Sequence, residues 1–309
     1  MRRLTLSLLL ALALAAVLLA RCATVRPYSE VRRGLPAERL LPIDGRLVYV
    51  EQQGTGEPVV LVHGFGASSY SWRKVIPGLA AAHRVVALDL NGFGYTERPK
   101  DPGSYTREGQ ARLVLAVMDA LGIARADLVG HSYGGAISLF LASRHPERVR
   151  SLVLVDSAAP SYPEDRRSGS ARFRPLNTLY LRFALRPWFV RRSYEKSVYD
   201  PALATPEVVA AYLDRLRIEG EEDAYYGLTA PRSPTDTTAD VDLTKIATPT
   251  LVLWGAEDRL VAVETGRKIS ARLPHSRFVV FEKTGHMPME ERPDDFLRLV
   301  GEFLAAGPK

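Results

Sequence analysis

Short apolar segments alternate with longer amphipathic segments along the chain, and this alternation restricts the fold more than any other feature of the sequence. The middle apolar segments are rich in Val and Leu without a period of two, which is typical of strands buried on both faces. The pattern predicts strands at residues 47–51, 59–62, 85–90, 127–130, 151–156, 250–254 and 277–281. It predicts helices at residues 71–82, 107–121, 134–144, 263–273 and 294–304. Such an order favours a mostly parallel central sheet with helices on both faces.

One long segment, residues 158–243, interrupts this alternation. It contains no convincing strand and carries aromatic and basic segments punctuated by Pro. We therefore predict an α/β core made of residues 39–157 and 244–309, with a helical cap at residues 158–243 inserted into it. A chain of 309 residues with 46% hydrophobic content is long enough for one large core that carries such an insertion.

The N-terminus has the charged start and apolar middle of an export signal. Arg2 and Arg3 precede the apolar residues 4–20, and Arg21 follows them. We predict a signal peptide or membrane anchor at residues 1–22, a polar tether at residues 23–38, and an exported, membrane-associated or periplasmic protein. Residues 19–22 resemble a lipoprotein box, although Arg21 departs from it. Cys22 is the one cysteine, which excludes an intramolecular disulfide.

The formal charge of +6 is concentrated in one stretch. Residues 166–192 contain eight arginines and no acid. A membrane surface and an anionic substrate are candidate partners of this stretch, and a solvated helix face is the alternative. No motif of a nucleic-acid-binding module accompanies the charge, so we predict no nucleic-acid partner. The oligomeric state does not follow from the sequence.

Ser132 stands in the sequence Gly130-His131-Ser132-Tyr133-Gly134, between a predicted strand and a predicted helix. This is the context that a G-x-S-x-G nucleophile requires. The sharp turn strains the serine backbone, and side chains at the two glycine positions would collide with neighbouring backbone. We predict that Ser132 is a nucleophile at a helix N-terminus.

A serine hydroxyl needs a base, and His286 is the best placed of the six histidines. It follows the last strand, so it leaves the same edge of the sheet as Ser132. Asp258, after the penultimate strand, is the predicted carboxylate partner and completes the chain order serine, acid, histidine. Glu257 and Asp156 are alternative acids, although Glu257 is predicted to be solvated.

Donors for an oxyanion are predicted in the turn after residues 59–62. We expect the backbone N–H groups of Phe65 and Tyr133 to form the oxyanion hole and His63 to brace the turn by hydrogen bonds. The turn at residues 89–94 is predicted to shape the base of the pocket. The predicted substrate-binding residues are Gly64, Trp188 and Met287.

Five segments together resemble the α/β-hydrolase superfamily, in the branch with a helical cap. They are HGFGAS at 63–68, DLNGFGYTERP at 89–99, GHSYGG at 130–135, WGAEDRLV at 254–261 and GHMPMEERP at 285–293. The resemblance implies an α/β-hydrolase fold with the cap inserted after the sixth strand. It also implies a carboxylesterase-like or lipase-like serine hydrolase that forms an acyl-enzyme on a small-molecule ester or acyl substrate. No metal and no organic cofactor is implied. Haloalkane dehalogenases and epoxide hydrolases are similar but carry Asp as nucleophile, and Ser132 argues against both.

Two other functions stay open on the same residues. The first is hydrolysis of a carbon–carbon bond in a ring-cleavage product, in which arginines of residues 166–192 would bind an acidic substrate. The second is a non-catalytic ligand-binding protein of the same fold.

Overall fold

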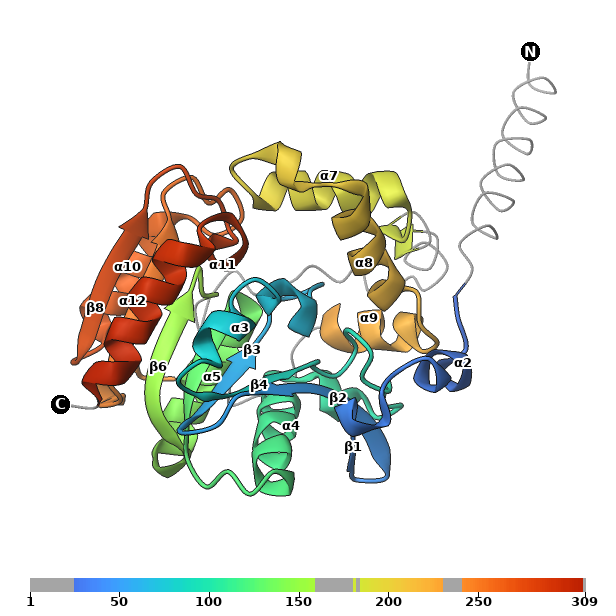
Figure 1. Ribbon diagram of the computed structural model, residues 1–309, viewed down its shortest axis with the longest axis horizontal. Coiled ribbons are helices and arrows are strands. Elements are labelled where there is room, and N and C mark those ends of the chain that lie inside the picture. The colour runs from blue at the N-terminus through green and yellow to red at the C-terminus, as the bar shows by residue number, and fades with distance from the viewer. Residues whose placement is uncertain (1–24, 159–179, 182–183, 230–240, 308–309) are drawn as a thin grey trace, which may run out of the picture.

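The computed structural model describes residues 25–158, 180–181, 184–229 and 241–307 (Figure 1). The predicted export segment, Cys22 and most of the arginine-rich stretch lie outside these residues, and what we predicted for them stays a prediction. Among the described helices, none combines the length and apolar character that crossing a membrane needs.

An eight-stranded sheet forms the centre of the chain, in the order β1-β2-β4-β3-β5-β6-β7-β8. The strands are β1 Leu40–Ile43, β2 Arg46–Gln53, β3 Pro58–Val62, β4 Arg84–Leu88, β5 Ala126–His131, β6 Val149–Val155, β7 Thr250–Gly255 and β8 Ser276–Phe281. The β1/β2 and β2/β4 pairs are antiparallel, and all pairs from β4 through β8 are parallel. The predicted fold class is confirmed, with the cap following the sixth strand.

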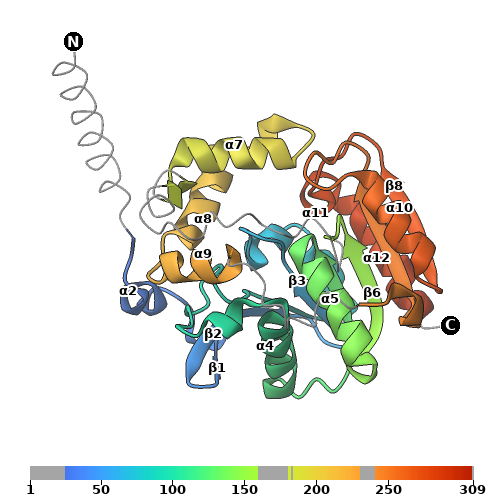
Figure 2. The same cartoon turned by 180° about the vertical axis from the view of Figure 1, so that it is seen from behind.

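Helices cover both faces of this sheet. The core helices are α3 Ile76–Leu79, α4 Arg107–Ala120, α5 Tyr133–Arg144, α10 Val263–Arg272, α11 Pro288–Glu291 and α12 Pro293–Ala306. Apolar residues of α4, α5 and α10 pack on one face, and those of α3 and α12 pack on the other. α3 and α12 are on the near side in Figure 1, and α4 and α5 are on the near side in Figure 2. Alternate residues of each parallel strand therefore enter two separate cores, which explains the continuous apolar runs.

The cap lies over the edge of the sheet toward which β3 and β6 point (Figure 1). Its described helices are α7 Pro187–Ser197, α8 Pro206–Leu216 and α9 Glu221–Thr229, and no strand occurs in the described part of residues 158–243. In the register of the sheet, Gly130 pairs with Leu154 and Val155 pairs with Leu253. The residues that follow β5, β6, β7 and β8 thus meet at one edge, directly beneath the cap.

Three local features differ from the sequence analysis. β1 was not predicted, although Asp44 and Gly45, with φ of 48° and 74°, form a two-residue hairpin loop that joins it to β2. The helix predicted at residues 71–82 is reduced to a 3-10 turn, Ser69–Trp72, and the short α3, because Pro77 and Gly78 are poor residues for a helix interior.

The predicted tether is also partly ordered. It contains the helix α2 Tyr28–Arg33. Just before this helix, Arg26 forms an isolated parallel β-bridge with Ile218 of the cap. Arg26 forms an ion pair of 2.7 Å with Asp214 on α8, and the buried side chains of Tyr28 and Val31 pack on Ile218. The segment is held on the cap because burial of these apolar side chains against Ile218 is favourable.

Candidate active site

Ser132 lies in a sharp turn between β5 and α5. Its φ of 51° is in the left-handed region, where a residue with a side chain is strained. Its N–H donates to Val155 O at 2.9 Å and its carbonyl accepts from Ala158 N at the same distance. A Cβ on Gly134 would lie 2.1 Å from Val62 O, so this position requires Gly. The predicted reason for the glycines therefore holds in the structure.

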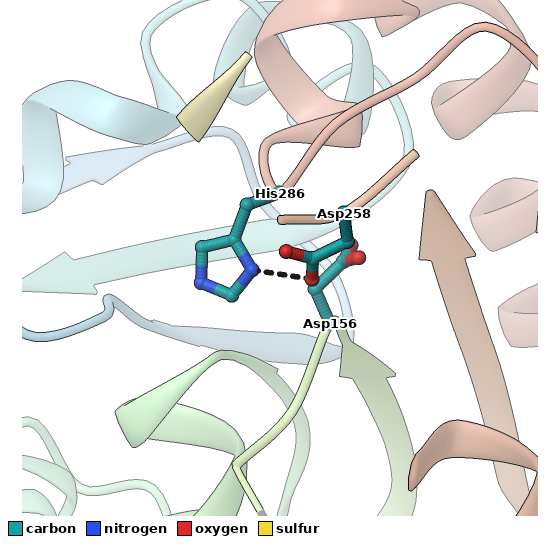
Figure 3. Close-up of side chains that lie close together, drawn as sticks. All are labelled: Asp156, Asp258 and His286. Atoms are coloured by element: carbon teal, nitrogen blue, oxygen red, sulfur yellow. Dashed lines mark hydrogen bonds and ion pairs between the residues drawn. The ribbon is translucent and has the colours of Figure 1, made fainter. Parts of the chain in front are cut away.

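His286 and Asp258 meet at the same edge of the sheet. His286 Nδ1 lies 2.6 Å from Asp258 Oδ2, and both side chains are buried (Figure 3). The other Asp258 oxygen accepts backbone N–H groups from Leu260 at 2.7 Å and Val261 at 3.0 Å. Burial alone would raise the pKa of Asp258, but the hydrogen bonds from His286 and from these N–H groups bring it below its usual value. Asp258 is therefore an ionised acceptor, and it orients the imidazole so that its second nitrogen points away from the acid (Figure 3).

His131 supports His286 from beneath. Its Nε2–H donates to the carbonyl of His286 at 2.7 Å, and the two rings are 4.8 Å apart. Burial lowers the pKa of His131 to about 3, so the ring is neutral near pH 7. We assigned His131 no role from the sequence, so this bond to the histidine loop was missed.

The two alternative acids have other contacts. Asp156 lies against Asp258, on the side opposite to His286 (Figure 3). Glu257, which we predicted to be solvated, is half-buried and accepts the backbone N–H of Thr284 at 2.8 Å. This bond ties the end of β7 to the loop that carries His286.

The predicted oxyanion turn packs directly against Ser132, since a Cβ on Gly64 would lie 3.1 Å from Ser132 Cβ. His63 braces this turn as expected. Its Nε2 accepts the N–H of Leu90 at 3.0 Å, and its Nδ1–H donates to Gly64 O at 2.7 Å. Tyr133 is the first residue of α5, and its ring lies 6.4 Å from that of Phe65. Tyr133 directly follows Ser132, and Phe65 follows Gly64, which packs on Ser132, so the backbone of both predicted donors is near the serine.

A cavity of about 450 Å³ joins Ser132 and His286 to the cap. Its described lining is mostly apolar and aromatic; the residues include Phe65, Phe93, Tyr180, Leu181, Leu185, Phe189, Val190, Leu228, Val261 and Met287. Met287, a predicted substrate-binding residue, is among them, whereas Gly64 and Trp188 are not. Trp188 is 59% exposed, because α7 turns the adjacent Phe189 toward the cavity instead.

Comparison with known proteins places the chain in a family. Residues 57–293 match the family model described as alpha/beta hydrolase fold, and the chain belongs to this family. It is 36% identical over 265 residues to a 2-hydroxymuconate semialdehyde hydrolase of Pseudomonas sp. (strain CF600), covering 83% of this chain and 89% of that protein. The chain is therefore an enzyme of the hydrolase class.

Solved structures agree with this assignment. A meta-cleavage product hydrolase from Pseudomonas fluorescens superposes with a TM-score of 0.72 at 27% identity, covering 86% of this chain and 97% of that one. An esterase from Thermogutta terrifontis superposes with a TM-score of 0.68 at 28% identity, covering 87% and 97%. The fold is thus shared by relatives that cleave different bonds.

Proposed function

We propose that the chain is a serine hydrolase in which Ser132 attacks a substrate carbonyl, His286 accepts its proton and Asp258 holds the imidazole. The observation that carries the proposal is the 2.6 Å contact of His286 with the buried Asp258, since His286 and Ser132 both line one cavity. A base held by a buried carboxylate beside a strained serine is the arrangement that nucleophilic catalysis needs.

The chemistry then proceeds in two halves. The Ser132 oxygen bonds to the carbonyl carbon while His286 Nε2 takes the hydroxyl proton, and the carbonyl electrons move onto its oxygen. The backbone N–H groups of Phe65 and Tyr133 are the proposed donors to that oxyanion. The imidazolium protonates the leaving group, and water activated by the neutral His286 releases the acyl group from Ser132.

For the substrate, we propose a ring-cleavage product that is cut at a carbon–carbon bond. The similarity to 2-hydroxymuconate semialdehyde hydrolase and to the 2-hydroxy-6-oxo-2,4-heptadienoate hydrolase of Pseudomonas putida supports this proposal. A carbon leaving group takes the bonding electron pair, so it departs only where conjugation with a second carbonyl delocalises that pair. The proton that His286 received from Ser132 then completes the new C–H bond.

Hydrolysis of an ester of an uncharged acid is a second candidate, favoured by the electrostatics of the cavity. Its described lining contains no Lys or Arg and one acid, Glu221. Of the arginines that we expected to bind an acidic substrate, the described Arg186, Arg191 and Arg192 do not line it. A dienoate carries a carboxylate, which an apolar cavity with an acid binds poorly unless a cation neutralises it.

A direct comparison of substrates tests these proposals. The purified protein is assayed with 2-hydroxy-6-oxo-2,4-heptadienoate, by loss of its absorbance, and with p-nitrophenyl esters of increasing chain length. A higher kcat/KM for the dienoate than for any ester supports carbon–carbon cleavage, and the reverse order supports the esterase. Ser132→Ala should lose at least about 1,000-fold in kcat on either substrate. Activity of this variant close to that of the unmodified enzyme would overturn the nucleophile assignment.

A further inference from the structure

Asp156 is a buried acid that the proposed chemistry leaves unused. It follows β6 directly, its side chain is fully buried, and its φ is 44°. Its Oδ1 accepts the N–H of Gly255 at 2.9 Å, and no hydrogen-bond donor among the described residues reaches Oδ2. The Asp156 carboxyl lies beside that of Asp258 (Figure 3). One carboxyl oxygen of each acid and a ring nitrogen of His286 all lie within 4.8 Å of one another.

Two adjacent buried carboxyl groups do not both ionise, because their charges repel and neither is well solvated. The donors around the pair decide which one carries the charge. Asp258 accepts three hydrogen bonds, from His286, Leu260 and Val261, whereas Asp156 accepts the one from Gly255. Each donor stabilises an anion, so the negative charge belongs on Asp258.

The pKa directions agree with this distribution of charge. Burial, and then the charge of Asp258, raises the pKa of Asp156 well above its usual value. The acid Glu291, whose side chain also faces this cluster, raises it further. Among the residues that the structure describes, His286 is the one basic side chain that bonds to the pair, and it bonds to Asp258. A protonated Asp156 removes both the charge repulsion and the lack of a partner at its Oδ2.

We propose that Asp156 is protonated at Oδ2 and that this O–H donates a hydrogen bond to the Asp258 carboxylate. Asp156 is then a positioning residue for the Asp258–His286 pair. The proposal rests on the proposed function. It assigns Asp156 neither contact with substrate nor the place of Asp258. The bond gives the Asp258 carboxylate a fourth donor and fixes its rotation, so that Oδ2 stays aimed at His286 Nδ1. Without this donor, the two backbone N–H groups at Oδ1 would be the described contacts that hold the carboxylate independently of His286, and Oδ2 would be held by the imidazole alone.

The local backbone suits this role. Asp156 N–H donates to Leu253 O at 3.0 Å, which fixes the left-handed conformation at the end of β6. Asp and Asn tolerate that conformation better than most residues. An Asn at position 156 would therefore fit without new strain, and its amide group would supply the same donor to Asp258 and the same acceptor to Gly255. Ala would supply neither.

The test measures the rate at which a fluorophosphonate probe labels Ser132, as a function of pH. This rate reports activation of the serine and needs no identified substrate. The variants are Asp156→Asn, Asp156→Ala and, as a matched control, Asp127→Asn. Asp127 is a buried acid that forms an ion pair of 2.6 Å with Arg150. It lies at the start of β5, whereas Ser132 follows the end of this strand. Circular dichroism verifies that each variant is folded.

We expect Asp156→Asn to label within about threefold of the unmodified enzyme, with an unchanged midpoint of the acid limb. Asp156→Ala should label roughly 10-fold more slowly or worse, because a hydrogen bond to a charged group is lost. Asp127→Asn should leave the midpoint unchanged.

Three results would overturn the proposal. Equal labelling by Asp156→Ala would show that the donor does not matter, and slow labelling by Asp156→Asn would show that an amide cannot replace the acid. A lower midpoint in Asp156→Asn would mean that residue 156 is ionised in the unmodified enzyme, because removing a negative charge destabilises the imidazolium. If Asp156→Ala does not fold, the midpoint of Asp156→Asn decides alone. Failure of the unmodified, folded enzyme to label refutes the proposed function instead.

Discussion

Glu290 is the buried acid that fastens the cap to the core, and its removal gives the sharpest stability prediction. Its side chain is fully buried on α11, four residues after His286. The carboxylate accepts from Arg73 and from the Tyr194 hydroxyl at 2.6 Å each, and from the Tyr212 hydroxyl at 2.9 Å. Since α7 and α8 supply the two tyrosines, one carboxylate joins two cap helices to the core.

The size of the effect follows from these contacts. Glu290→Ala leaves the half-buried guanidinium of Arg73 without its charge partner, and removing one member of a buried ion pair costs about 3–5 kcal/mol. A chain of 309 residues at about 2.1 cal/mol/K per residue has an unfolding entropy of about 0.65 kcal/mol/K. The expected decrease in Tm is therefore about 5–8 °C.

Calorimetry or thermal circular dichroism measures this decrease. The matched control is Glu302→Ala, which removes an exposed ion pair with Arg298 on α12 and should lower Tm by less than about 1 °C. A Tm of Glu290→Ala within about 1 °C of the unmodified protein would refute the reasoning, since the cluster would then contribute no net stability.

Two further predictions concern the loop after β8 and the acid pair. A Cβ on Gly255 would lie 1.9 Å from the carbonyl oxygen of Gly285, so Gly255→Ala should displace the proposed base and slow fluorophosphonate labelling about 100-fold. The control Gly301→Ala has open space at its Cβ and should label at the rate of the unmodified enzyme. Equal labelling rates of the two variants would contradict this prediction. Burial and the charge of Asp258 raise the pKa of Asp156, so the stability linked to Asp156 is fully present below its unfolded pKa of about 3.9 and is lost as pH rises through the folded pKa. Asp156→Asn should therefore gain Tm relative to the unmodified protein as pH increases from 4 to 8, and a constant difference across that range would argue against a raised pKa.

The sequence predicted the placement of the candidate site residues where the sheet itself brings them together. Ser132, Asp258 and His286 each follow a parallel strand, and parallel strands place their carboxyl ends at one edge. The strand order along the chain was therefore enough to bring the three residues into one region. The turn at His63 was predictable for the same reason, because it follows β3 at that edge.

Contacts between distant surfaces were not predictable in this way. Trp188 and Phe189 are adjacent aromatic residues, and only the rotation of α7 against the core decides that Phe189 lines the cavity. Nothing in the sequence around Glu290 indicates that its carboxylate is buried, because the two tyrosines that bond to it come from the cap. The missed β1 is different, since Asp44-Gly45 between two apolar segments is a local hairpin signal.

The cap bonds directly to the segment that carries the proposed base. His286 N–H donates to Ser197 O at 2.7 Å, at the end of α7, and Tyr199 N–H donates to Glu291 at 2.6 Å. Glu291 in turn accepts the N–H of Gly285 at 2.9 Å. A change of cap that alters the shape of the cavity would therefore also alter the backbone that holds His286. Substrate selectivity and catalytic rate are therefore linked through these bonds. Replacement of the cap by that of a relative should change kcat as well as KM, unless residues 197–199 keep their position.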